Sequence, residues 1–159
     1  MTTDMITTFW ETFLEDRKSR NLPLPVRYDA WHFCNDETSA NNLADLVLAG
    51  QKKATASLFW EYEAEGSSVP KPGDLSIITR WDGTPVCIIE TTEITIYPFD
   101  QVPESFAFDE GEGDRSLQYW KDVHLAYFTE ECAAIGRTVE PSMPVVCERF
   151  RMIYRPTPK

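Results

Sequence analysis

The segment around Gly50 changes from a helical to an extended pattern, and this change most constrains the fold. Residues 39–49 carry apolar side chains at helical spacing, and Ser39 can cap the first turn. Gly50 stands where helices often end in the left-handed conformation. β-Branched and aromatic residues follow, which predicts a long strand over residues 54–63. The sequence therefore predicts a helix-to-strand junction immediately after Gly50.

The rest of the chain predicts two more helices and three more strands. Helical spacing of apolar residues covers residues 4–20 and 115–135. Strand patterns cover residues 75–81, 85–96 and 144–154. Residues 26–34 fit either a short strand or an aromatic-rich loop. This order predicts an α+β domain whose mostly antiparallel sheet closes into a β-barrel flanked by helices.

The residues on either side of the predicted helix over 115–135 are polar or glycine, which is typical of helix ends. We expect Asp114 to cap its start and Gly136 to end it. Residues 104–114 before it are acidic and interrupted by glycine, which is also typical of a solvated loop.

The charge of the chain restricts its partners. The 159 residues include 15 Lys and Arg against 26 Asp and Glu, so the net charge is −11. Tight binding to a nucleic-acid backbone draws on many basic contacts. A small nucleoside or a short single strand of RNA is therefore easier to accommodate than a duplex. The length predicts a single domain over residues 1–159.

Metal ligands are sparse in the sequence. The four cysteines are Cys34, Cys87, Cys132 and Cys147. They stand far apart and form no CxxC pair, and three of the four lie in apolar stretches. Only His32 and His124 accompany them, so we expect buried free thiols, no metal site and no cofactor. The sequence starts without a basic and apolar leader, and we expect a cytoplasmic protein with no membrane partner.

The junction carries a cluster of reactive side chains, in which Lys52 and Thr55 stand three residues apart. A threonine hydroxyl becomes a nucleophile when a neighbouring base removes its proton. A lysine can be that base only when neutral, which requires a desolvated site because its ordinary pKa is about 10.4. Both lysines of the junction could equally be solvated cations at a helix C-terminus.

Several separated motifs together resemble the ASCH domain family, over roughly residues 26–154. They are Leu46–Tyr62, Pro72–Asp74, Glu90–Thr92, Glu110–Leu117 and Val145–Phe150. The resemblance implies a PUA-like fold, with residues 4–20 as a helical extension. Lys53 departs from the family, in which threonine is common at this position.

One branch of that family is an amidohydrolase that releases cytidine and acetate from N(4)-acetylcytidine. By resemblance, Lys52, Thr55 and Glu110 match its catalytic residues, with Thr55 as a nucleophile activated by Lys52. Glu112 is a rival for the carboxylate because the glycines around it leave the alignment open. We expect the remaining substrate contacts from Lys53, Ser57, Trp60, Glu112 and Arg115.

Two other functions stay open from the sequence. The chain could be a non-catalytic module that binds RNA or a base in the same region, or a ribonuclease that needs no metal. Trp60 could stack on a base, but large aromatic residues more often belong to the core.

Overall fold

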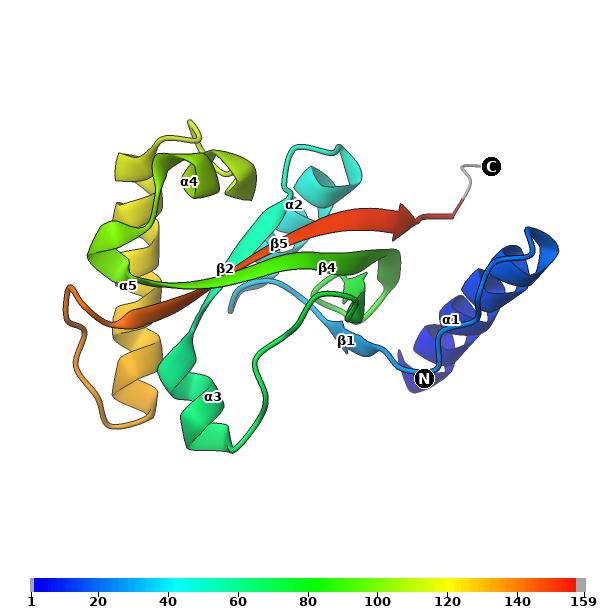
Figure 1. The fold of residues 1–159 in the computed structure, drawn as a ribbon, viewed down its shortest axis with the longest axis horizontal. Coiled ribbons are helices and arrows are strands. Elements are labelled where there is room, and N and C mark those ends of the chain that lie inside the picture. The colour runs from blue at the N-terminus through cyan, green and yellow to red at the C-terminus, as the bar shows by residue number, and fades with distance from the viewer. Residues whose placement is uncertain (1, 157–159) are drawn as a thin grey trace. The chain divides into compact units, whose positions relative to one another are not determined.

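The computed structural model describes residues 2–156, apart from the side chains of residues 2 and 3 (Figure 1). The helices are α1 (Thr2–Ser19), α2 (Glu37–Leu48), α3 (Phe59–Glu65), α4 (Glu104–Glu110) and α5 (Leu117–Ala134), with a 3₁₀ turn at Phe99–Gln101. The strands are β1 (Asp29–Trp31), β2 (Ala54–Leu58), β3 (Leu75–Thr79), β4 (Pro85–Pro98) and β5 (Pro144–Tyr154). None of the helices within residues 2–156 is both long and apolar enough for a bilayer crossing.

The strands form a sheet in the order β1-β3-β4-β5-β2. β1 pairs with β3 in parallel, whereas the β3–β4 and β2–β5 pairs are antiparallel. The predicted α+β class and the mostly antiparallel sheet are thus confirmed.

The chain divides into two compact units. The first unit comprises the residues up to Gly50, Gly73–Glu90 and the residues from Arg151 onward. The second unit comprises Gln51–Pro72 and Thr91–Phe150. The expected single domain over residues 1–159 stays a prediction.

In the first unit, α1 packs on the sheet through aromatic residues. The core consists of Trp10, Phe13, Leu75, Ile77 and Ile88. The ring of Tyr154, near the end of β5, lies 5.5 Å from that of Phe9 and 5.3 Å from that of Phe13. The helix predicted over residues 4–20 is therefore part of a hydrophobic core.

The second unit has its own core, built around one face of β2. Ala54 and Leu58 are buried there with residues of β5, α4 and α5, including Val145, Phe106 and Phe128. Figure 1 shows α4 beside α5, at the end of the sheet where β2 pairs with β5. All predicted site residues belong to this unit.

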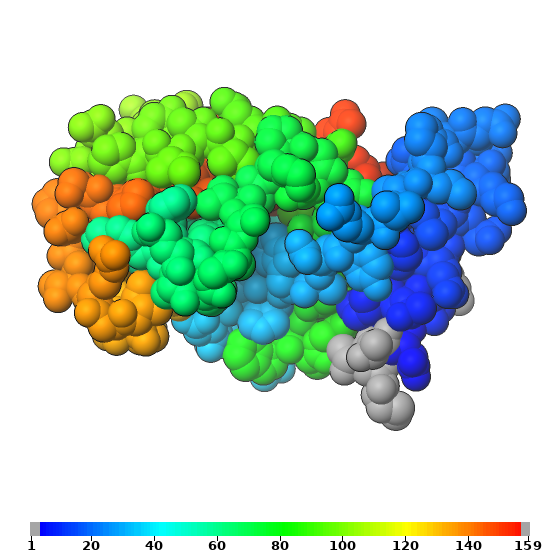
Figure 2. Space-filling model, turned by 60° about the horizontal axis from the view of Figure 1, so that its bottom comes forward, coloured from blue at the N-terminus to red at the C-terminus, as the bar shows by residue number. Residues whose placement is uncertain are grey.

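The predicted strand over residues 54–63 is wrong in its second half, because it ends at Leu58 and Phe59 begins α3. Glu and Ala in this segment favour helix, and Gly66 ends it in the left-handed conformation with φ 68°. In Figure 2, α3 (teal) lies against the segment that ends α5 (orange). The aromatic residues that suggested a strand instead place Trp60 against the core of the second unit.

Three other local predictions need correction. Residues 104–110 form α4 and bury Phe106, so they are not a solvated loop. Asp36 rather than Ser39 caps α2, because its side chain accepts from the Ser39 N–H. Ser116 rather than Asp114 caps α5, and its hydroxyl accepts from the Tyr119 N–H.

Candidate functional site

The connection between α2 and β2 is held in place on both sides by backbone hydrogen bonds. The Lys53 N–H donates to the Asp109 carbonyl at 2.8 Å, and the Lys53 carbonyl accepts from the Phe150 N–H at 3.0 Å. The Gln51 side chain donates to the Gly111 carbonyl at 2.5 Å. The sequence prediction that the lysines lie between a helix and a strand is confirmed, but the segment is clamped between α4 and β5.

Gly111 permits this close approach of the two segments. Its φ is +71°, and a β-carbon there would lie 2.4 Å from the Gln51 carbonyl oxygen. No L side chain fits both the backbone conformation and the space. The glycine after Glu110 therefore sets how close the end of α4 comes to Lys52.

The Lys52 side chain is buried, with 1% of its surface exposed, and its ammonium is enclosed by acceptors. Nζ lies 2.9 Å from Glu110 Oε1, 2.8 Å from Glu112 Oε2 and 3.3 Å from the Glu110 carbonyl oxygen. An ammonium has three donors, and these three oxygens match them. Lys52 is therefore not the solvated cation that its place after a helix suggested.

Both carboxylates considered for the site contact the same ammonium. Glu110 is buried, with 2% of its side chain exposed, whereas Glu112 retains 16%. Glu110 Oε2 accepts a further hydrogen bond from Trp120 Nε1 and lies 3.0 Å from His124 Nε2. Glu110 is thus the centre of the cluster, and Glu112 is its partner closer to solvent.

The surroundings of His124 favour a proton on each of its ring nitrogens. Nδ1 lies 2.8 Å from the Trp120 carbonyl oxygen, which can only accept, and Nε2 faces the carboxylate of Glu110. The imidazole also stacks on the Trp120 ring at 4.2 Å between centroids. Two cations, Lys52 and His124, therefore balance two anions, Glu110 and Glu112, inside the second unit.

The electrostatics of these groups reinforce their charges. Burial alone would lower the pKa of Lys52, but attraction to Glu110 and Glu112 raises it above its ordinary value. Burial likewise opposes the charge of His124, yet attraction to Glu110 raises its pKa. Burial would raise the pKa of Glu110, and the two cations outweigh that effect and hold the pKa well below its usual range. These directions favour the charged form of all three groups.

The sequence prediction missed His124 and Trp120 at this site. They stand four residues apart on α5, so one face of the helix presents both side chains. A histidine and a tryptophan at helical spacing also fit a plain hydrophobic core. Their role depends on the nearby carboxylate of Glu110. Only the tertiary structure shows that this carboxylate lies beside them.

Thr55 lies on a different surface from the Lys52 cluster. Ala54, Ala56 and Leu58 contact the core of the second unit, so the alternation of β2 turns Thr55 and Ser57 to the other face. Thr55 is the direct cross-strand partner of Glu148 on β5. Lys52 contacts Glu110 and Glu112, whereas Thr55 lies opposite the carboxylate of Glu148.

The other predicted substrate contacts are distributed around the unit. The Lys53 side chain is exposed, and Ser57 Oγ lies 2.8 Å from Tyr62 Oη. Trp60 is half-buried, and the Arg137 guanidinium lies 4.2 Å from the centroid of its ring. Arg115 donates to the Phe108 carbonyl at 3.0 Å and stacks on the Phe108 ring at 3.6 Å.

Among the described residues, no three His, Cys, Asp or Glu side chains are arranged to hold a metal ion. Cys87, Cys132 and Cys147 are buried free thiols and Cys34 is half-buried, as the sequence predicted for three of the four.

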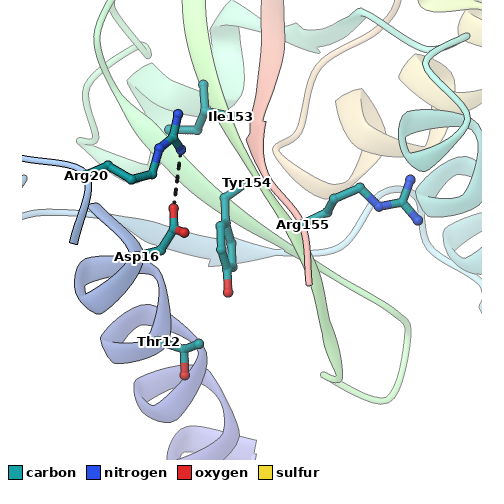
Figure 3. Close-up of a pocket in the computed structure, with 6 residues that line it drawn as sticks. All are labelled: Thr12, Asp16, Arg20, Ile153, Tyr154 and Arg155. Atoms are coloured by element: carbon teal, nitrogen blue, oxygen red, sulfur yellow. Dashed lines mark hydrogen bonds and ion pairs between the residues drawn. The ribbon is translucent and has the colours of Figure 1, made fainter. Parts of the chain in front are cut away.

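The first unit has a surface pocket whose lining residues differ from those of the Lys52 cluster (Figure 3). Side chains from α1 and from the end of β5 line it: Thr12, Asp16, Arg20, Ile153, Tyr154 and Arg155. Its ion pair joins Arg20 and Asp16 at 3.4 Å, with both side chains largely in water. An exposed pair of this kind contributes little binding energy.

The comparisons with known proteins agree on one family. The model of the ASCH domain matches residues 29–154. The crystal structure of an ASCH domain from Lactobacillus crispatus is 38% identical, has a TM-score of 0.87 and covers 96% of each chain. The crystal structure of a protein from Enterococcus faecalis is 34% identical, with a TM-score of 0.86, over 95% of this chain and 89% of that one.

A third crystal structure, of a hypothetical protein, shares the fold alone. It is 22% identical, with a TM-score of 0.51, over 78% of this chain and 99% of that one. No curated protein matches the chain. The family is associated with binding nucleic acids or small molecules. The matched region and the two close structures show that this chain belongs to the ASCH domain family, with its PUA-like α+β fold.

Proposed function

We propose that this protein is a hydrolase that cleaves an amide in a modified nucleoside or a related small molecule, such as N(4)-acetylcytidine. The observation that carries the proposal is the contact of Lys52 with both Glu110 and Glu112. The lysine and the carboxylates are about sixty residues apart in the sequence, and the family resemblance paired them as site residues.

The ionisation of Lys52 restricts its role. Its ion pairs favour the charged form, which does not act as a base on Thr55. In our proposal, Lys52 therefore positions the site: its ion pairs with Glu110 and Glu112 hold the end of α4 beside the residues that precede β2, the strand that carries Thr55. Glu112 is the partner nearer to solvent, with 16% of its side chain exposed.

In the same proposal, Thr55 is the nucleophile. Its hydroxyl lies on a half-buried strand, on the face away from the core. Lys53, Ser57, Trp60 and Arg115 are proposed to contribute contacts to the base or sugar. A small neutral substrate suits a chain of net charge −11, since a nucleic-acid backbone would be repelled.

A hydrolysis assay with N(4)-acetylcytidine tests this function. The wild type should release cytidine, Thr55→Val should lose activity, and Lys52→Met should lower kcat strongly. Thr92→Val is the matched control, because Thr92 is an exposed threonine of β4 in the same unit. A folded wild type without turnover would remove this substrate.

The second candidate is a non-catalytic module that binds a base or a short single-stranded RNA. The neutralised charge of the Lys52 cluster favours it, because such a cluster can serve as a rigid structural element without any reaction. Binding of cytidine or a short oligonucleotide, measured by calorimetry in the absence of any turnover, would support this alternative.

A further inference from the structure

The second unit has a second buried carboxylate besides Glu110. Glu148 lies on β5 with 6% of its surface exposed, and its direct cross-strand partner is Thr55 of β2. Side chains of such pairs share one face of the sheet, with β-carbons about 4.5–5.5 Å apart. The carboxylate of Glu148 can therefore reach the hydroxyl of Thr55.

The surroundings of Glu148 are rich in hydroxyl groups. Thr91 Oγ1 of β4 donates to Glu148 Oε2 at 2.6 Å. Tyr62 of α3 lies close enough for the negative charge of Glu148 to help raise its pKa, after the larger effect of burial. The Tyr62 hydroxyl in turn shares a hydrogen bond with Ser57, the next outward residue of β2 after Thr55.

A buried carboxylate needs hydrogen-bond donors to remain charged. The Thr91 hydroxyl is such a donor, and it fixes one oxygen of Glu148 in place. A carboxylate so held, facing a threonine on the neighbouring strand, has the arrangement of a base and a nucleophile.

We propose that Glu148 is the catalytic base that removes the proton of Thr55, and that Thr91 positions it. This inference rests on the proposed amide hydrolysis, for which it supplies the base that a charged Lys52 does not. From sequence, the role of the base fell to Lys52 by resemblance, and Glu148, although inside the Val145–Phe150 motif, had no role assigned.

The reaction balances in two steps. In the first, Thr55 Oγ bonds to the amide carbon while Glu148 takes the hydroxyl proton; the C–N bond then breaks, and Glu148 returns that proton to the leaving amine. In the second, Glu148 takes a proton from water, the hydroxide adds to the acyl ester, and the C–O bond to Thr55 breaks as the proton returns to Oγ. One amide and one water thus give one amine and one carboxylic acid.

Two measurements test the proposal together. The first is the pH dependence of kcat/KM for N(4)-acetylcytidine in the wild type and in Glu148→Gln, Thr91→Val and Glu93→Gln. The second is acetylation of Thr55 by 4-nitrophenyl acetate, located by mass spectrometry of peptides. Glu93 is an exposed carboxylate of β4 in the same unit and serves as the matched control.

We expect Glu148→Gln to lower kcat/KM by about 10²-fold or more, the usual size of a general-base contribution. It should also slow the acetylation of Thr55 by a similar factor. In Thr91→Val, the acidic limb of the profile should move to higher pH, since the carboxylate loses a donor that stabilises its charged form. Glu93→Gln should match the wild type in both measurements.

The outcomes separate this proposal from the proposed function. Turnover of N(4)-acetylcytidine by Glu148→Gln at the wild-type rate would overturn the role of Glu148 and leave the hydrolase standing. A wild type that turns over no N(4)-acetylcytidine, yet is acetylated at Thr55 faster than Glu148→Gln, would remove the substrate and support the base. Absence of both turnover and acetylation in the folded wild type would overturn both.

If Glu148→Gln does not fold, Glu148→Asp keeps the charge but withdraws it from Thr55, and unchanged rates in that variant would also count against the proposal.

Discussion

His124 Nε2 lies 3.0 Å from Glu110 Oε2, and attraction to this carboxylate raises the pKa of the buried imidazole against the effect of burial. The other ring nitrogen is fixed by the Trp120 carbonyl, so the ring cannot lose a proton without breaking one of two contacts. The pair joins α5 to the end of α4 and, through Glu110, to Lys52. The charges of the candidate site are therefore part of what holds the second unit together.

The first prediction concerns the pH dependence of this pair. The pKa of His124 is higher in the folded protein than its unfolded value of about 6.5. Its charge therefore stabilises the fold fully below that pH, and the contribution is lost as pH rises through the folded pKa. Glu110 acts in the opposite range, because its lowered pKa gives stability above about 4.3 that is lost on acidification.

An NMR titration of the imidazole protons measures the first of these effects directly. The chain has two histidines, so the variant His32→Gln assigns the His124 signal. We expect a midpoint above 6.5 for His124. A midpoint at or below that value would show that Glu110 does not hold the charge.

The second prediction concerns the backbone approach at Gly111. Gly111→Ala should destabilise the protein by about 3 kcal/mol, from backbone strain at positive φ together with overlap on the Gln51 carbonyl. Gly66→Ala is a matched control: its φ is +68°, and no atom lies within 4 Å of the added carbon. It should cost only about 1 kcal/mol.

Urea unfolding of the three proteins measures these differences. Equal losses in both variants would mean that the backbone conformation accounts for the whole effect, and that the close approach to Gln51 is unimportant.

The third prediction concerns the buried ammonium. Lys52→Met should destabilise the protein by about 3–5 kcal/mol, because it leaves Glu110 buried with one cation fewer. The double variant Lys52→Met/Glu110→Gln should be less destabilised than the sum of its single variants, since the carboxylate charge is removed together with its partner.

Lys53→Met provides the control next to it. The Lys53 side chain is exposed, so this change should alter the free energy of unfolding by no more than about 0.5 kcal/mol. Additive losses in the Lys52 and Glu110 variants would contradict a direct interaction between the two side chains.

The sequence predicted the elements of this fold well where one pattern dominated. The helix of residues 4–20 and the strand of residues 144–154 have unambiguous spacing, and both are present. Phe59–Glu65 combined aromatic residues that favour strand with Glu and Ala that favour helix. The left-handed Gly66, which ends α3, could not be recognised before the helix itself was known.

The site was predictable in part, and for a physical reason. The resemblance paired Lys52 with either Glu110 or Glu112, and sequence spacing could not decide between the two carboxylates. In the structure, both carboxylates contact the Lys52 ammonium. The pairing of Thr55 with Glu148 depends on the register of two strands almost a hundred residues apart. Local patterns carry no information about that register.

The fourth prediction concerns a carboxyl pair between α3 and α5. Burial, a hydrogen bond with Glu131 and repulsion from Glu131 and Glu65 raise the pKa of Glu61 to about 8. A carboxyl group with a raised folded pKa stabilises the fold below its unfolded value, about 4.3, and that stability is lost as pH rises toward 8. Glu61→Gln removes the titrating group and should flatten this loss.

Unfolding free energies of the wild type and Glu61→Gln at pH 5 and pH 9 test this expectation. The variant should gain stability relative to the wild type between the two pH values. Glu63→Gln, an exposed change on the same helix, removes the same charge and should follow the wild type. If Glu61→Gln and Glu63→Gln respond alike, the effect comes from the general negative charge of the chain and not from a proton shared between the two helices.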